Sequence, residues 1–344
     1  MKENGLYVVV TTIQAPTAAM RTVGRALQRW GGRMLVVGDK KGPLTYPVAQ
    51  SELLTIEGQL ALPWRLPSRL PVNHYARKNA GYLLAISRGA RCIYETDDDN
   101  APNGSWKPRK QEIKAIGVAR QGWCNVYSHF STQRVWPRGF PLEELSDSSR
   151  STPGSSLRTR TVWSPIQQGL ADGNPDVDAV WRLVEPAEIR FRVKPALALG
   201  RGAWCPFNSQ STWWWPDAYA LMYLPSYCTF RMTDIWRSFI AQRCVWEIGG
   251  SVSFHAAEVV QDRNIHNLLK DFKDEVPGYL NNGRIREILS GVRLQRGTKA
   301  TSENLLRCYE ALVEHEIFPK AELALVKAWL QDLKGITERT SRTL

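Results

Sequence analysis

The hydrophobic pattern of the first forty residues predicts a strand, a helix and a second strand. The continuous β-branched run at 6–13 is typical of a strand covered on both faces, and a helical pattern follows at 18–30. A second buried strand is predicted at 33–38. In a right-handed βαβ unit of this kind, ligands bind beyond the carboxyl ends of the strands. The residues at those ends include Thr11, Thr12, Gly38, Asp39 and Lys40.

The next elements bring an acidic cluster to the same edge of the predicted sheet. A helix is expected from Asn73, as its N-cap, to a stop near Gly89. A short strand at 92–94 then leads into Glu95-Thr96-Asp97-Asp98-Asp99. Carboxylates are costly inside a sheet, so we expect them to emerge with the earlier loops at its ligand-binding edge.

Composition indicates an ordinary globular protein with a positive charge. The 344 residues are 43% hydrophobic, and the six cysteines and five histidines show no zinc-site or disulfide spacing. The apolar run at 6–13 is too short to span a membrane, which favours a cytoplasmic protein. A net charge of +12 indicates an anionic partner. Basic residues form no dense arm, so the prediction is a phosphorylated substrate or peripheral contact with an anionic membrane face, not nucleic acid.

Three consecutive carboxylates repel one another unless a cation compensates for their charge. Mg²⁺ and Mn²⁺ are commonly held by one or two carboxylates plus substrate phosphates, so Asp97 and Asp99 are the expected metal ligands, with Asp98 beside them. Such an ion neutralises the charge on a departing nucleoside diphosphate. The alternative interpretation is a solvated acidic loop.

Neighbouring polar residues are candidates for holding the rest of a nucleotide. Arg77, Lys78 and Asn79, near the start of the predicted helix, could pair with phosphate oxygens, although a solvated helix face would have the same pattern. Asp39 could accept a hydrogen bond from a nucleobase imide, or it could cap its own turn.

A family resemblance adds to these patterns. Segments spread over about residues 6–260 resemble the STELLO-type glycosyltransferases in order and spacing. The matching segments are residues 9–13, 36–41, 76–83, 93–99, 135–142, 166–170, 175–179, 207–212 and 246–250. More distantly, the acidic cluster and residues 175–179 resemble the UDP-arabinopyranose mutases, also known as reversibly glycosylated polypeptides.

The resemblance implies an α/β fold of the GT-A type, with a Rossmann-like nucleotide-sugar-binding domain and a mixed central sheet. That domain is expected at 1–260, with a nucleotide-binding half at 1–105 and an acceptor and catalytic half at 106–260. Helical periodicity predicts a C-terminal helical appendage at 261–344.

The implied activity is metal-dependent transfer from a nucleotide sugar, by default a UDP-sugar, to a glycan or polysaccharide acceptor, lipid-linked acceptors included. Two alternatives stay open. A nucleotide-sugar mutase would need no acceptor, and a scaffold that retains the GT-A fold would have no activity.

An inverting transferase needs a carboxylate that takes the proton of the acceptor hydroxyl. Asp234 begins a helical pattern that runs to Trp246, and it resembles the acid at a helix start that serves as base in many GT-A enzymes. A simple N-cap is the alternative. Asp176 and Asp178 are the second candidates, because alternation would place both on one side of an extended segment.

Sugar contacts are expected from a polar and aromatic segment. Fourteen tryptophans are many for this length, and an indole can pack against a pyranose, although large aromatics chiefly build cores. The expected substrate contacts are Asn208, Ser209, Gln210, Trp213 and Trp214, together with Glu247 in the last matching segment.

Overall fold

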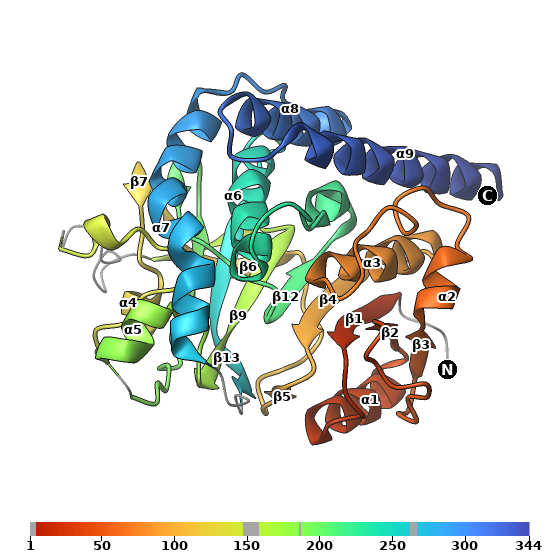
Figure 1. The fold of residues 1–344 in the computed structure, drawn as a ribbon. Coiled ribbons are helices and arrows are strands. Elements are labelled where there is room, and N and C mark those ends of the chain that lie inside the picture. The colour runs from red at the N-terminus through yellow and green to blue at the C-terminus, as the bar shows by residue number, and fades with distance from the viewer. Residues whose placement is uncertain (1–4, 147–157, 186, 262–266, 344) are drawn as a thin grey trace.

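The computed structural model describes residues 5–146, 158–185, 187–261 and 267–343 (Figure 1). Within these ranges the central sheet has eleven strands. They are β1 (Leu6–Thr12), β2 (Arg33–Gly38), β3 (Ser51–Leu54), β4 (Cys92–Asp97), β5 (Asn100–Pro102), β6 (Glu112–Val118), β8 (Thr159–Trp163), β9 (Ile166–Gly173), β10 (Ala196–Leu199), β12 (Ser211–Trp214) and β13 (Val252–Gln261). A separate two-stranded sheet pairs β7 (Gly122–Trp123) with β11 (Ala203–Trp204).

Helices surround the sheet (Figure 1). The α-helices are α1 (Ala18–Trp30), α2 (Ile56–Leu60), α3 (Lys78–Ser87), α4 (Tyr127–Phe130), α5 (Ala179–Val184), α6 (Thr233–Val245), α7 (Leu268–Gly291), α8 (Thr301–Glu314) and α9 (Lys320–Thr343). Short 3-10 turns are η1 (Tyr75–Arg77), η2 (Leu142–Glu144), η4 (Pro216–Met222), η5 (Phe230–Met232) and η6 (Thr298–Ala300). None of the helices in the described ranges is long and apolar enough to cross a membrane.

The sheet is mixed, and its direction reverses near the middle. Strands follow the order β3-β2-β1-β4-β12-β9-β13-β10-β6-β8, with β5 paired to β13. The first four strands are parallel to one another, whereas β12 is antiparallel to both of its neighbours, β4 and β9. The parallel strands therefore end at one edge, as ligand-binding α/β sheets require. The predicted α/β fold with a mixed central sheet is confirmed.

Alternation along β1 explains why the sheet is covered on both faces. Tyr7 and Val9 belong to the large apolar cluster that contains α3, and Val8 and Val10 belong to the cluster that contains α1. On the α3 side, a Cβ added at Gly81 would lie 2.6 Å from a Val37 methyl and 2.7 Å from a Val9 methyl. The predicted strands at 6–13 and 33–38 and the predicted helix at 18–30 are confirmed within a residue.

The predicted start of the next helix needs a correction. Asn73 is not its N-cap: it has a φ of 51°, and the chain enters the 3-10 turn η1 with His74 as the cap before α3 begins. The backbone N–H groups of Asn73 and His74 donate to Asp39, at 2.8 and 3.0 Å. A side chain from a distant loop therefore sets the start of this helix, and local helix signals could not show that.

The C-terminal region is helical as predicted, and it packs into the core of the sheet domain. One apolar cluster joins Ile285, Leu312 and Trp329 of these helices to Tyr223 and Phe239. Helix α9 runs along the top of the view in Figure 1 and packs against α8 and α3. The predicted division at 260/261 separates two parts of the sequence that share this core.

Two carboxylates of α9 bind backbone N–H groups of loops on opposite sides of the domain. Glu322 accepts from the N–H of Tyr227 at 2.8 Å, and Asp332 accepts from those of Arg65 and Leu66 at 2.9 and 2.8 Å. Buried N–H donors are costly when unpaired, so these bonds stabilise both loops. Helix α9 thus joins a loop of the first 105 residues to a loop of residues 106–260.

A buried ion pair beneath the sheet edge gives the first testable prediction. Arg237 of α6 pairs with Glu95 of β4 at 2.8 Å, and both side chains are almost completely buried. Arg237→Met leaves the buried Glu95 without its cationic partner, so it should lower the free energy of unfolding by about 3–5 kcal/mol in urea titrations. Arg88→Met removes an exposed partner of Glu52 and serves as the control, with an expected loss below about 1 kcal/mol. Equal losses in the two variants would contradict the prediction.

Candidate active site

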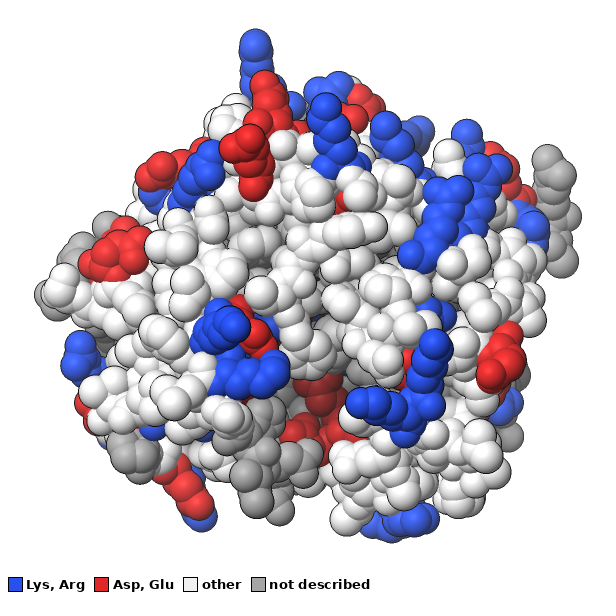
Figure 2. Space-filling view, in the orientation of Figure 1, with Lys and Arg blue, Asp and Glu red and all other residues white. Residues whose placement is uncertain are grey.

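A cavity of about 610 Å³ opens beyond the carboxyl ends of β1, β2 and β4. Figure 2 shows acidic side chains in a hollow of the surface, with basic side chains on either side. The predicted residues that line the cavity are Thr11, Thr12, Gly38, Asp39, Arg77, Asp97, Asp98, Asp99, Asp176, Asn208, Gln210 and Asp234. Residues predicted from segments more than two hundred positions apart therefore meet in one cleft.

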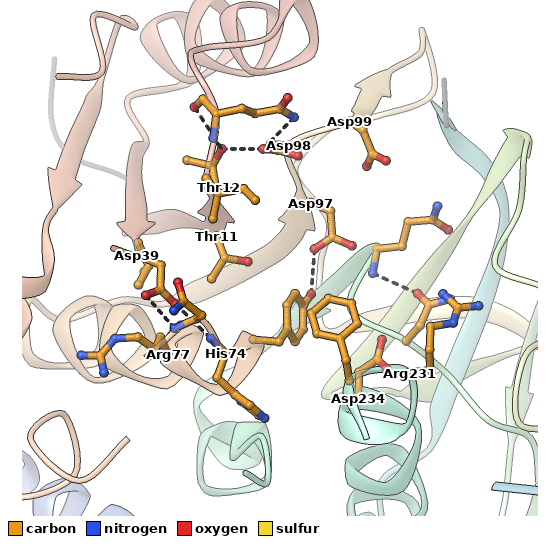
Figure 3. A pocket seen from close by; sticks show the side chains of 18 of the residues that line it. Thr11, Thr12, Asp39, His74, Arg77, Asp97, Asp98, Asp99, Arg231 and Asp234 are labelled. Atoms are coloured by element: carbon orange, nitrogen blue, oxygen red, sulfur yellow. Dashed lines mark hydrogen bonds between the residues drawn. The ribbon is translucent and has the colours of Figure 1, made fainter. Parts of the chain in front are cut away.

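The three acidic residues of the cluster differ in their partners (Figure 3). Asp97 is the last residue of β4, and its carboxylate accepts from Tyr75 Oη at 2.7 Å and Lys78 Nζ at 3.1 Å. Asp98 turns towards β1, where Thr12 and Gln14 donate to it. Asp99 accepts from Gln261 Nε2 at 3.0 Å. Asp97 and Asp99 thus remain at the centre of the cleft, while Asp98 supports the loop.

The electrostatics of the cluster favour a bound cation. Burial raises the pKa of Asp99 to about 7, and the charges of Asp97 and Asp98 add to this effect. Burial also raises the pKa of Asp97, against the opposing charge of Lys78. Both shifts come mainly from burial, which makes ionised carboxylates costly here even with Lys78 beside Asp97.

The donor set fits a hard divalent ion that also binds a ligand. Among the described residues there is no group of three or more acidic, histidine or cysteine side chains that could hold a metal ion by itself. Asp97 and Asp99 offer oxygen ligands, the type that Mg²⁺ and Mn²⁺ prefer, and substrate phosphates commonly complete such sites. The residues present therefore fit a metal that binds together with a phosphorylated substrate.

Asp234 lies in the first turn of α6, on the opposite wall of the cleft. Its Oδ2 accepts from the backbone N–H of Ser209 and from Arg138 Nη2, both at 3.1 Å, and Ser209 Oγ lies 3.2 Å from the same oxygen. Arg138 also binds Asp176 through two parallel bonds of 2.8 Å. Burial opposes ionisation of Asp176, yet Arg138 holds its pKa below the usual range. One arginine thus keeps two cleft carboxylates in place.

The side chains of Arg77, Lys78 and Asn79, which were predicted to bind phosphate, bind other groups of the protein. Arg77 points away from the cleft, where its guanidinium donates to Gln59 Oε1 at 2.6 Å and to Leu70 O at 2.9 Å. Lys78 is buried beneath Asp97, and Asn79 exchanges two hydrogen bonds with the backbone of Leu224. The sequence pattern placed these residues correctly near the cleft but could not show which way their side chains point.

Asp39, predicted to bind a nucleobase, also has a structural role. Asp39 Oδ1 accepts from the N–H of Lys40 and Asn73, and Oδ2 accepts from that of His74. The turn-capping alternative is therefore realised, while Asp39 still lines the cavity. Lys40 is exposed and does not line it, but the next residue, Lys41, does.

The tandem tryptophans lie in the core. Trp213 Nε1 donates to Glu258 and Trp214 Nε1 donates to Glu95, both at 2.8 Å, and both indoles are fully buried. Successive residues of a strand point to opposite faces of the sheet, so each indole pairs with a buried carboxylate on its own face. Neither can contact a sugar in the cleft, which corrects that prediction.

Asp178 and Glu247 also lie outside the cavity lining. Asp178 is fully buried as the N-cap of α5, where burial raises its pKa to about 7. Glu247 binds Arg201 and Arg243 near the far end of α6. From Asp234 to its end at Val245, α6 rises by about 16 Å, at about 1.5 Å per residue, so Glu247, which follows that end, cannot share a substrate with Asp234.

Several cleft residues carry no signal in the sequence alone. The structure adds Ile13, Gln14, Lys41, Asn73, His74, Tyr75, Arg138, Arg182, Phe230, Arg231 and Gln261 to the lining. Phe230 is 59% exposed and makes an edge contact with Tyr75, at 5.5 Å between ring centroids. Ile13, Lys41 and Arg138 lie in segments that resemble the family, and that resemblance was the one signal that could have indicated them. Tyr75 lies just before such a segment.

Comparison with known proteins identifies a family region in the chain. The model of the STELLO glycosyltransferases matches residues 231–342, which include Asp234 and the C-terminal helices. Two Arabidopsis thaliana relatives, the probable glycosyltransferases STELLO1 and STELLO2, are 26% and 27% identical and align with 98% and 95% of the chain. The resemblance to the STELLO glycosyltransferases is confirmed. The alignments cover 45% and 44% of these relatives, so the chain spans about half their length.

Two solved structures are more distant from this STELLO-like chain. A mycobacterial protein has a TM-score of 0.40 and 9% identity, over 80% of this chain and 74% of the other. The M. tuberculosis glucosyl-3-phosphoglycerate synthase has a TM-score of 0.37 and 8% identity, over 80% of each chain.

The position of Glu247 predicts a role in stability. Hydrogen bonds from Arg201 lower its pKa to about 2 despite its burial, so the ionised form stabilises the fold. Glu247→Gln should lower the free energy of unfolding at pH 7 by about 2 kcal/mol, since one pKa unit corresponds to about 1.4 kcal/mol and Arg201 is half exposed. A depressed carboxyl pKa gives stability above the unfolded value of 4.5 that is lost as pH falls towards 2.

The measurement is urea unfolding of both proteins at several pH values. The difference between them should hold at pH 7 and shrink as pH falls below 4.5. Glu287→Gln, at a side chain that is 72% exposed, is the control and should change stability little. A Glu247 variant that keeps full stability but loses ligand binding would instead support the substrate contact.

Proposed function

We propose that this chain is a metal-dependent glycosyltransferase that uses a nucleotide-sugar donor, by default a UDP-sugar, and a glycan or polysaccharide acceptor, with inversion at the anomeric carbon. One observation carries the proposal. Asp97 and Asp99 emerge at the ligand-binding edge of the parallel strands, and Asp234 faces them across the same cavity. The STELLO relatives, whose names describe glycosyltransferases, support the same class of reaction.

The donor would lie against β1, β2 and β4. Thr11, Thr12 and Gly38 line the cavity at the strand ends, and Lys41 supplies positive charge near the diphosphate. Mn²⁺ or Mg²⁺ held by Asp97 and Asp99 would neutralise the charge that develops on the leaving diphosphate. The phosphates in turn would supply the ligands that the two carboxylates leave open.

Asp234 is the proposed base. It takes the proton of the acceptor hydroxyl as that oxygen forms a bond with the anomeric carbon, and the bond from this carbon to the diphosphate oxygen breaks with its electron pair. Ser209 and Arg138 hold Asp234 by its Oδ2 atom, so the orientation of the carboxylate is set before the acceptor arrives. Asp176 acts through Arg138 and keeps that arginine in position.

The acceptor would enter on the side of Phe230 and Arg231. An exposed aromatic ring packs well against the apolar face of a sugar, which makes Phe230 a better candidate for this contact than the buried Trp213 and Trp214. Arg182 also lines this part of the cavity. The net charge of +12 favours an acceptor that carries negative charge, including a lipid-linked phosphate at an anionic membrane surface.

Binding of the donor can be tested without knowledge of the acceptor. UDP with Mn²⁺ should raise the melting temperature, because a ligand that binds the folded state stabilises it. Asp97→Asn/Asp99→Asn should lose this shift, while Asp271→Asn, at a carboxylate outside the cleft, should keep it. Parallel samples with other nucleoside diphosphates identify the base. No Mn²⁺-dependent shift with any nucleotide would contradict the metal-dependent donor site.

Asp234→Asn tests the base. Transfer from the nucleotide sugar that binds best should fall by at least about 100-fold, the usual contribution of general base catalysis, while nucleotide affinity stays within about tenfold. Asp271→Asn, which also replaces a first-turn aspartate of a helix, is the matched control. Turnover at the wild-type rate in the Asp234 variant would reject the assignment. A product that forms from donor alone would indicate a mutase.

A further inference from the structure

Two hydroxyl groups connect the proposed metal ligand to the proposed base. Tyr75 Oη lies 2.7 Å from Asp97 Oδ1 and 2.6 Å from Ser209 Oγ. Ser209 Oγ lies 3.2 Å from Asp234 Oδ2. The path Asp97–Tyr75–Ser209–Asp234 therefore crosses the floor of the cleft from one wall to the other. It consists of three close oxygen–oxygen contacts.

These three contacts share only two hydroxyl hydrogens. An ionised carboxylate is an acceptor only, and each hydroxyl has one hydrogen to donate. The contact of 2.6 Å between Tyr75 and Ser209 needs a hydrogen, since two oxygens at this distance otherwise repel. Two arrangements satisfy this condition. In one, Ser209 donates to Tyr75 and Tyr75 donates to Asp97; in the other, Tyr75 donates to Ser209 and Ser209 donates to Asp234.

The distances indicate which arrangement the metal-free protein adopts. The contacts at Asp97 and between the hydroxyls, 2.7 and 2.6 Å, are as short as hydroxyl hydrogen bonds usually are. The contact between Ser209 Oγ and Asp234 is the longest, at 3.2 Å. Both hydrogens therefore point towards Asp97. Lys78 Nζ donates to Tyr75 Oη at 2.7 Å, which is compatible with either arrangement.

We propose that Tyr75 and Ser209 are positioning residues that couple cation binding at Asp97 to the orientation of Asp234. The proposal rests on the function proposed above. A divalent ion held by Asp97 would withdraw negative charge from its carboxylate and so weaken the hydrogen bond that Asp97 Oδ1 accepts from Tyr75. The two hydroxyls would then turn together towards Asp234, which would gain a charge-assisted hydrogen bond that holds its carboxylate for the acceptor. Donor binding would thereby prepare the base before the acceptor arrives.

Coupling of this kind is reciprocal, so it can be measured from the donor side alone. If the ion on Asp97 favours a hydrogen bond at Asp234, then the acceptor strength of residue 234 must favour the ion by the same factor. An asparagine at position 234 attracts the Ser209 hydrogen less than a carboxylate does. Metal affinity should therefore depend on residue 234, and the dependence should require both Tyr75 and Ser209.

The test is a double-mutant cycle on the affinity for Mn²⁺ with UDP, measured by calorimetry. Asp234→Asn should weaken binding in the wild-type background by about fivefold more than it does in Ser209→Ala or Tyr75→Phe backgrounds. Loss of a negative charge from the cleft acts through space and contributes equally in every background. The difference between backgrounds isolates the part that passes through the hydroxyls.

The chain contains a matched control pair. Tyr94 Oη lies 2.9 Å from Ser211 Oγ, and Ser211 donates to the buried Glu258, outside the cleft. Ser211→Ala should leave the effect of Asp234→Asn the same as in the wild type. An effect of Asp234→Asn that agrees within twofold in all backgrounds would overturn the coupling alone. Failure of both Mn²⁺ and Mn²⁺ with UDP to bind the wild-type protein would overturn the proposed function, and the coupling with it.

Discussion

The electrostatic cost of gathering carboxylates in one cleft is the constraint on which the rest of the site depends. Each carboxylate has a different partner. Backbone N–H groups hold Asp39, Lys78 and Tyr75 hold Asp97, and hydroxyl and amide groups hold Asp98. Arg138 serves both Asp176 and Asp234. Asp99 has neutral partners, and burial raises its pKa to about 7.

The framework that holds these acids is itself built on buried charge. Glu95 and Glu258 lie on opposite faces of the sheet, and each combines an arginine with an indole N–H: Arg237 and Trp214 for Glu95, Arg109 and Trp213 for Glu258. Buried carboxylates of this kind need a complete set of partners. They fix the antiparallel strand β12 against β4, and so place Ser209, just before β12, beside Asp234.

The C-terminal helices stabilise loops that lead to the cleft. Glu322 holds the backbone at Tyr227, close in sequence to Phe230, and Asp332 holds the loop at Leu66, whose neighbour Pro67 accepts from Arg77. Helix α9 thus holds two loops that lie close in sequence to, or in contact with, residues of the cleft lining. The STELLO family model covers these helices together with Asp234.

The sequence by itself determined the α/β class, the first strands and helix, and the edge of the sheet at which the acidic cluster emerges. The spacing of hydrophobic residues is enough to predict these elements, because it depends only on neighbouring positions in the chain. The strand–helix–strand order then predicts parallel strands. The family resemblance, not the residue pattern, linked Asp234 to the same site. Only the tertiary structure decided the orientation of side chains. Arg77 turns into a loop, Trp213 and Trp214 turn into the core, and Tyr75 and Ser209 meet across 134 positions. Such contacts depend on which strands become neighbours in the sheet. The antiparallel direction of β12 is set by packing over the whole sheet, and residues near β12 do not determine it alone.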